Sequence, residues 1–204
     1  MEPVRVRRRR ADDLPALAEV LLAQQPMTRY PFRDPLPMPV EQFLHADDAL
    51  SAWTAELGGR PVGHVCRTGP AAGFHDAAAL NDACADAHGC PVDALGWVST
   101  LFVGADARGR GLGELLLDAI VGDIRAAGLR PCLEVLPMRP AALALYRRSG
   151  WTEVLTLRPA WLREAAGEEG PDVVVMVLRA GVSPDRRRRG SADHSSDHAC
   201  PPVR

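Results

Sequence analysis

The sequence predicts a single domain of the mixed α/β class, built on one sheet with flanking helices. Three observations support this class. Strand-like and helix-like segments alternate along most of the 204 residues, and hydrophobic residues make up 47% of the chain, as in ordinary globular domains. The chain also contains a strongly apolar strand that leads through a glycine-rich turn directly into an amphipathic helix.

The strands are predicted from apolar or alternating runs that turn residues bound. Gly58-Gly59 separates two such runs and predicts a hairpin. The expected strands cover residues 4–10, 50–57, 61–67, 97–103, 131–136, 152–157 and 173–178.

The helices are predicted from apolar spacing and end signals. Asp12 and Asp13 offer an N-cap for the first helix, and Pro140 suits the first turn of a later one. The expected helices cover residues 14–25, 40–45, 76–87, 113–127 and 140–148. We interpret residues 69–95 as an insertion within a domain of residues 1–180, and residues 181–204, which are poor in apolar side chains, as a disordered tail.

The composition excludes several kinds of chemistry. All 24 basic residues are arginine, and the absence of lysine rules out a lysine nucleophile, a Schiff base and a P-loop. The net charge of −2 gives no general attraction for nucleic acid. We interpret the runs Arg7–Arg10 and Arg186–Arg189 as a solvated strand end and a solvated tail. No apolar run has the length of a membrane helix, so neither nucleic acid nor a membrane is expected as a partner.

The cysteines indicate a reducing compartment. There are five of them, an odd number, and no secretory signal precedes them, so we expect a cytoplasmic protein. Cys66 and Cys132 lie in apolar runs and are expected in the core. Cys84, His88 and Cys90 match no strong zinc spacing, so no metal site is predicted.

The most informative segment is residues 101–114, LFVGADARGRGLGE. The first N–H groups of the helix that follows have no partners within it, and the helix dipole favours an anion there. Glycines let a ligand approach the backbone closely, so the turn predicts a phosphate or pyrophosphate site. A dinucleotide fingerprint does not fit, because Glu114 stands where it needs a third glycine.

This turn and a segment downstream together resemble the GCN5-related N-acetyltransferase (GNAT) family. Arg108, Gly111 and Gly113 match the family's Q/R-x-x-G-x-G/A motif, and residues 141–151, AALALYRRSGW, resemble its A-x-x-L-Y-x-x-x-G-F segment. The clear motifs cover residues 97–157, and the order of elements extends the likeness to residues 4–179. The resemblance implies a mixed, mostly antiparallel central sheet, flanked by helices and splayed between two central strands.

The resemblance also implies the co-substrate, acetyl-CoA, and the residues that hold it. Backbone groups of the strand would bind the pantetheine arm, and a strand-end N–H near Val103 would polarise the thioester carbonyl. Amides of the turn would hold the pyrophosphate. The implied binding residues are Leu101, Phe102, Val103, Arg108, Gly109, Arg110, Gly111, Leu112, Gly113, Arg139 and Tyr146.

Two residues match the family's acid and base. Tyr146 matches a tyrosine that protonates the departing thiolate, and Glu134 matches a glutamate that serves some members as general base. The residues alone leave alternatives open, because Tyr146 also fits a packed helix tyrosine and Glu134 a polar strand residue. The implied reaction is direct attack of a free amine on the thioester in a ternary complex.

Arg139 departs from the family pattern, which has asparagine just before the helix. Arginine cannot accept the N–H bonds of a cap, so about 1 kcal/mol of capping is lost here. Arg139 could instead pair with a phosphate of the co-substrate or with an acidic acceptor.

The acceptor is poorly specified. In this family the loop after the first helix lines its site, which makes Tyr30, Phe32 and Arg33 candidate substrate-binding residues, although a solvated proline-rich loop is the alternative. A small-molecule amine or a protein N-terminus is expected as acceptor, with a homodimer left open. The alternative function is a non-catalytic acyl-CoA-binding module that senses acyl-CoA. The acidic residues of the insertion could attract a cationic amine or only be solvated; they are Asp76, Asp82, Asp86 and Asp93.

Overall fold

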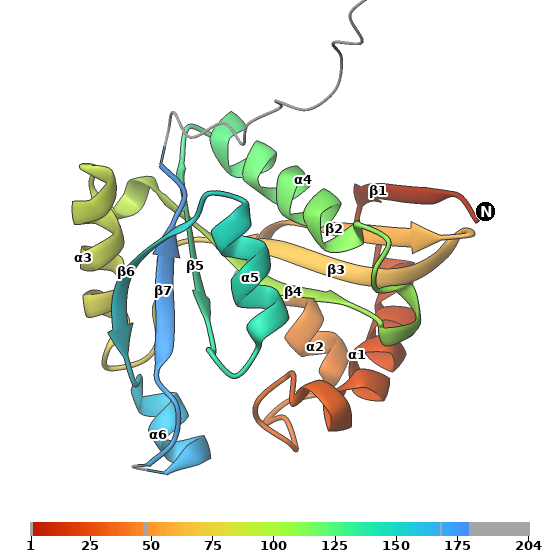
Figure 1. Ribbon diagram of the computed structural model, residues 1–204, viewed down its shortest axis with the longest axis horizontal. Helices are drawn as coiled ribbons and strands as arrows, with labels where there is room; N and C mark the ends of the chain where they lie inside the picture. Colours follow the sequence, from red (N-terminus) through yellow and green to blue (C-terminus); the bar gives the residue numbers. More distant parts are fainter. Residues whose placement is uncertain (1, 47–48, 168, 180–204) are drawn as a thin grey trace, which may run out of the picture.

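The computed structural model describes residues 2–46, 49–167 and 169–179. One sheet of seven strands forms the centre, in the order β1-β2-β3-β4-β5-β7-β6 (Figure 1). The strands are β1 (Val4–Arg8), β2 (Ala49–Leu57), β3 (Arg60–Thr68), β4 (Leu95–Val103), β5 (Arg130–Val135), β6 (Thr152–Leu157) and β7 (Val173–Val177). The helices are α1 (Leu14–Thr28), α2 (Val40–His45), α3 (Ala77–His88), α4 (Leu112–Ala126), α5 (Pro140–Arg148) and α6 (Ala160–Ala166), with short 3-10 turns at Ala11–Asp13, Val92–Ala94 and Ala105–Ala107.

The sheet is mostly antiparallel, as the sequence predicted. Every neighbouring pair of strands is antiparallel except β4 and β5, which run parallel. All seven expected strands are present, and the Gly58-Gly59 turn joins β2 to β3. The mixed fold class is confirmed.

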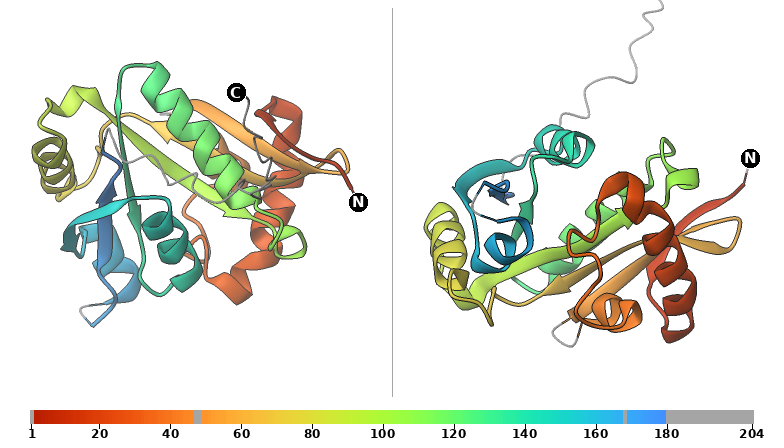
Figure 2. Two further views of the ribbon diagram at one scale, coloured as in Figure 1. Left: turned by 45° about the horizontal axis from the view of Figure 1, so that its top comes forward. Right: turned by 90° about the horizontal axis from the view of Figure 1, so that it is seen from below.

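The two faces of the sheet carry different helices. In Figure 1, α4 and α5 lie in front of the sheet, where they pack on Val98, Leu133 and Val135. The opposite face carries α3 and α6 over Trp97 and Cys132, and α1 and α2 over Phe102. Figure 2 shows α1 and α3 near opposite ends of the sheet. Alternate strand residues therefore reach opposite cores, as the pleat requires.

Two helices differ from the expectation. The first helix does not end at Gln25 but continues through Pro26 to Thr28. Helix α6 was missed, because its segment is short and is followed by glycine and glutamate; it forms because Leu162 is fully buried beneath it. Tertiary packing thus outweighs weak local propensity here.

The run Arg7–Arg10 is solvated only in part: Arg8 and Arg10 are exposed, whereas Arg7 and Arg9 are partly buried. Arg7 pairs with Asp13 and Glu56, and Arg9 donates to the carbonyl of Leu44. Asp13 stands at the N-cap of α1, but its side chain serves these ion pairs rather than the cap. The run Arg186–Arg189 and the predicted tail lie outside the described residues.

Cys66 and Cys132 are fully buried, which confirms their place in the core. His88 lies against the carbonyl of Pro131, and the described residues hold no cluster of three or more His, Cys, Asp or Glu side chains able to bind a metal. No helix in the described part of the chain has the length and apolar character needed to span a bilayer.

Candidate active site

The sheet opens between β4 and β5. Their parallel pairing extends from Leu95 opposite Arg130 to Val98 opposite Leu133 and stops there. Beyond that point the two strands border a cavity of about 720 Å³, the main cavity, which the ends of α1 and α5 also line. The opening is the feature implied by the family resemblance.

A bulge in β4 lies at this opening. Cys66 pairs with Ser99 and His64 with Phe102, so two residues of β4, Thr100 and Leu101, face one of β3. Thr100 has a φ of 50°, which is uncommon for a residue other than glycine. The bulge interrupts the alternation of side chains along β4. As a result, Trp97 and Phe102 face the same side of the sheet although an odd number of residue steps separates them.

A buried histidine supports the bulge. Nδ1 of His64 lies 3.2 Å from the carbonyl of Thr100, which can only accept, so Nδ1 carries the hydrogen. Nε2 then accepts from Arg9 at 3.2 Å. Burial, together with the charge of Arg9, lowers the pKa of His64 to about 3 and keeps the ring neutral. The peptide that joins Thr100 to Leu101 is thereby held in one orientation.

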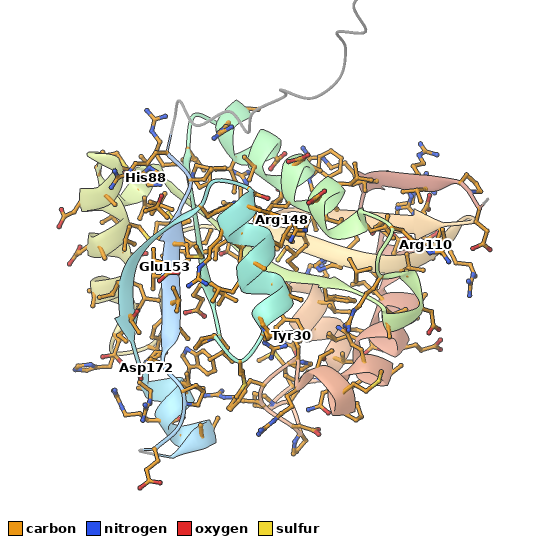
Figure 3. All side chains as sticks on the ribbon, in the orientation of Figure 1. Tyr30, His88, Arg110, Arg148, Glu153 and Asp172 are labelled. Carbon is orange, nitrogen blue, oxygen red and sulfur yellow. The ribbon has the colours of Figure 1, made fainter. Side chains whose placement is uncertain are left out.

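The glycine turn between β4 and α4 fits an anionic group. Gly109 and Gly111 have φ values of 74° and 76°, and nothing lies within 4 Å of the position of a Cβ at either residue. No side chain caps α4, so its first N–H groups remain available to a ligand. Figure 3 places Arg110 at this turn.

Arg108 braces the turn rather than extending from it. Its Nε donates to the carbonyl of Val103 at 3.1 Å, and Nη2 donates to the buried amide oxygen of Gln24 at 2.5 Å. The side chain therefore connects the end of β4 to α1. Both Arg108 and Gly113 line the main cavity.

Glu134 lies in β5 just past Leu133, the last residue of that strand that pairs with β4. Its neighbours Leu133 and Val135 belong to the core under α4 and α5, so Glu134 faces the opposite side. The side chain of Glu134 is exposed in the cavity, and the surrounding protein removes part of its hydration, which raises the pKa of the carboxyl to about 7. Both sequence-based readings of Glu134 are thus compatible with its position.

Tyr146 is packed and also reaches the main cavity. Only 6% of the residue is exposed, and its ring meets that of Trp151 edge-on at 6.0 Å. Burial raises the pKa of the phenol above its usual range, and the charge of Arg139 opposes this shift. The phenol therefore stays protonated at neutral pH.

Arg139 contacts the loop after α1. Its guanidinium donates to the carbonyls of Thr28 at 3.1 Å and Arg29 at 2.5 Å, and it lies 4.7 Å from the ring centre of Tyr30. No side chain caps α5 at this position, as the loss of asparagine predicted. Arg139 thus connects the start of α5 to the loop of residues 29–39, which we call the acceptor loop.

The three candidate acceptor residues, Tyr30, Phe32 and Arg33, all line the main cavity. Arg33 donates to the carbonyl of Trp161 at 3.2 Å, and this bond connects the loop to α6, the helix that the sequence did not predict. Tyr30 lies beside the N-terminal end of α5 in Figure 3 and is packed edge-on against Phe43.

Several cavity residues were missed by sequence reasoning. Gln24, Met38, Phe43 and Trp161 line the main cavity. A buried glutamine on an apolar helix face was the one available signal for Gln24. The other three are ordinary apolar residues, and only the tertiary fold brings them to the site.

The comparisons with known proteins agree with this geometry. Residues 15–151 match the family model described as the acetyltransferase (GNAT) family. Among solved structures, the ribosomal-protein-alanine N-acetyltransferase of Brucella melitensis superposes with a TM-score of 0.63 at 22% identity, over 85% of this chain and 98% of that chain. The structure of yncA from Salmonella typhimurium with its cofactor acetyl-CoA gives 0.62 at 16% identity, over 90% and 98%.

A third structure, the ribosomal-protein-S18-alanine N-acetyltransferase of Escherichia coli, gives a TM-score of 0.58 at 17% identity, over 86% of this chain and 93% of that chain. No curated protein matches the chain significantly. The opened sheet and its structural neighbours define an acetyltransferase fold. The chain belongs to the acetyltransferase (GNAT) family, which the match over residues 15–151 shows.

Proposed function

We propose that the protein transfers an acetyl group from acetyl-CoA to a primary amine. One observation carries the proposal: the sheet opens between β4 and β5 into a cavity that Glu134, Tyr146 and the two ends of the glycine turn, Arg108 and Gly113, border. A titratable acid, a titratable base and an anion cradle around one cavity suit acyl transfer to an amine.

The residues present fit acetyl-CoA. The amides of Arg108 through Gly113 would hold the pyrophosphate, since Gly109 and Gly111 leave the backbone uncovered. The stretch of β4 from Leu101 to Val103 does not pair with β5, and on that side it would offer backbone groups to the pantetheine arm. Arg108 supports this arrangement through Val103 and Gln24, not through a free guanidinium.

The co-substrate supplies an activated acetyl thioester. Glu134, directly or through a water, takes a proton from the amine, whose nitrogen then bonds to the acetyl carbon as the carbon–sulfur bond breaks. Tyr146 gives its proton to the sulfur. A base with a pKa of about 7 is well matched to work near neutral pH. No covalent bond to the protein forms at any step.

The acceptor is proposed as a small-molecule amine or a protein N-terminus. Two of the structural neighbours are named for acetylating alanine of ribosomal proteins, which makes a protein N-terminus a natural class to test. Tyr30, Phe32 and Arg33 line the main cavity, which supports an acceptor site there.

The test is release of the CoA thiol from acetyl-CoA with a panel of amines and peptides. Saturable release that needs both reactants supports the proposal, and Tyr146→Phe should lower kcat about tenfold or more while acetyl-CoA still binds. A burst of acyl-enzyme would contradict direct attack. If calorimetry shows that acetyl-CoA binds, but no amine causes release of the CoA thiol, the non-catalytic acyl-CoA-binding module is favoured.

A further inference from the structure

A second cavity, of about 410 Å³, lies across Glu134 from the glycine turn. Glu134, Ser99 and Thr100 line both cavities. Phe74 and Trp97 add to the wall of the second one alone, on the face of the sheet that carries α3. The glycine turn precedes α4, which covers the opposite face, so the turn and the second cavity lie on different faces of the sheet.

Among the described residues, apolar side chains make up most of the wall of the second cavity, and Gln42, Thr68, Ser99 and Thr100 add polar groups beside Glu134. Among the described residues that line it, Glu134 is the only one with a charged side chain. Phe43, Phe74 and Trp97 contribute aromatic surface, and Met38 and Leu80 contribute aliphatic surface. None of the four aspartates at 76, 82, 86 and 93 lines either cavity, so they do not form the cation-attracting wall that the sequence allowed.

One wall is held by a single buried amide. Asn81, the only asparagine of the chain, accepts from the N–H of Ala71 at 2.9 Å and donates to the carbonyl of the same residue at 2.8 Å. Only 6% of Asn81 is exposed. Both polar groups of Ala71 are thereby fixed, and Ala71 and Ala72 line the cavity. An irregular segment is thus held as a defined wall.

We propose that the second cavity binds the apolar substituent of the acceptor. The substrate class is then a primary amine with one compact apolar or aromatic group and no second charge nearby, its amino group at Glu134. The volume of about 410 Å³ lies at the lower end of the range for small-molecule sites, about 300–1,000 Å³, which suits a side-chain-sized group. This inference rests on the proposed function and specifies the acceptor of the same site.

The experiment compares three amines with the full chain and acetyl-CoA, by thiol release. 2-Phenylethylamine presents an aryl group, ethanolamine a short polar group and putrescine a second charge. We expect kcat/KM for 2-phenylethylamine to exceed that of the other two by about tenfold or more, the scale set by differential burial in an apolar pocket.

Two variants alter the wall in different ways. Asn81→Ala releases Ala71, and Ala72→Trp fills the cavity from an exposed position while Asn81 stays intact. Each should lower kcat/KM for 2-phenylethylamine about tenfold and leave KM for acetyl-CoA unchanged. Ala79→Trp, the same change at an exposed position of α3 that lines neither cavity, is the matched control.

The outcomes separate the two proposals. Equal turnover of the three amines, or 2-phenylethylamine kinetics that Ala72→Trp leaves unchanged, overturns this inference while the proposed function stands. Should Asn81→Ala fail to fold, Ala72→Trp still decides the matter. Absence of thiol release with every amine, including peptides, overturns the proposed function and this inference with it.

Discussion

Glu134 combines access from the cavity with surroundings that disfavour its charge. With a pKa of about 7 the carboxyl is neutral below that pH and becomes a base above it. We therefore expect kcat/KM to rise with pH through about 7, and Glu134→Gln to lose this limb together with about 100-fold or more in rate. The measurement is kcat/KM against pH for two amines of different pKa. A limb due to Glu134 keeps the same pH midpoint with both amines, whereas a limb due to the amine shifts with its pKa.

The same shift has a consequence for stability. The folded-state pKa lies above the unfolded value, so the unfolded chain loses the proton first and the wild type loses stability as pH rises from about 4.5 to 7. Glu134→Gln should be more stable than the wild type at pH 8 and lose that advantage at pH 4. Denaturant unfolding of both proteins at pH 4 and pH 8 checks this. A stability difference between them that is the same at the two pH values would show that the carboxyl is not desolvated.

Arg139 acts on the acceptor loop through Thr28, Arg29 and Tyr30. Arg139→Asn should therefore raise KM for the acceptor by about tenfold, the loss of roughly one hydrogen bond, and leave KM for acetyl-CoA unchanged. Arg147→Asn, on the same helix and paired with exposed Glu153, is the control. A rise in KM for acetyl-CoA alone would instead identify Arg139 as a phosphate contact.

At the scale of elements, a substitution by alanine should have opposite effects at two glycines of α4, one at its N-cap and one within the helix. Gly111 has a φ of 76°, so Gly111→Ala should cost about 1–2 kcal/mol of unfolding free energy and weaken acetyl-CoA binding. Gly122 lies within the helix with no atom within 4 Å of a Cβ, and Gly122→Ala should add about 0.5–1 kcal/mol.

Calorimetry with acetyl-CoA and thermal unfolding compare the two variants on one helix. Only Gly111→Ala should change the affinity. Wild-type affinity in Gly111→Ala would mean that the turn does not approach the ligand closely.

Sequence patterns predicted the strands and helices better than the irregularities within them, such as the bulge in β4. Every strand follows from apolar runs, and the turn before α4 follows from its glycines, because these signals are local. The bulge at Thr100 depends on a buried partner, His64, that lies 36 residues away, and no local pattern marks it. Trp161 likewise reaches the site through a contact with Arg33, 128 residues away.

For the whole molecule, the opened sheet separates two kinds of binding surface. One face brings α4, with the glycine turn, and α5, with Tyr146; on the other, α2 and α3 border the second cavity. Residues of β4 and β5 at the opening belong to both surfaces. A reaction between two bound molecules thus needs no large rearrangement in this architecture.

The first strand is tied to the rest of the sheet by a buried ionic cluster. Arg7 binds both carboxylate oxygens of Asp13 at 2.7 Å, and Thr54 from β2 donates to Asp13 at 2.9 Å. Burial alone would raise the pKa of Asp13, but the bonds from Arg7, the N–H of Arg10 and Thr54 lower it to about 2. Asp13 thus joins β1, β2 and the start of α1.

Since the folded-state pKa of Asp13 lies below the unfolded value, its contribution is complete above pH 4 and is lost as pH falls towards 2. Asp13→Asn should cost about 3 kcal/mol at pH 7 and much less at pH 2.5. Glu114→Gln breaks the exposed pair with Arg148 and should cost less than about 1 kcal/mol at either pH. Urea unfolding of the three proteins at both pH values measures these differences. A cost for Asp13→Asn that does not change with pH would mean that packing, not charge, holds β1 in place.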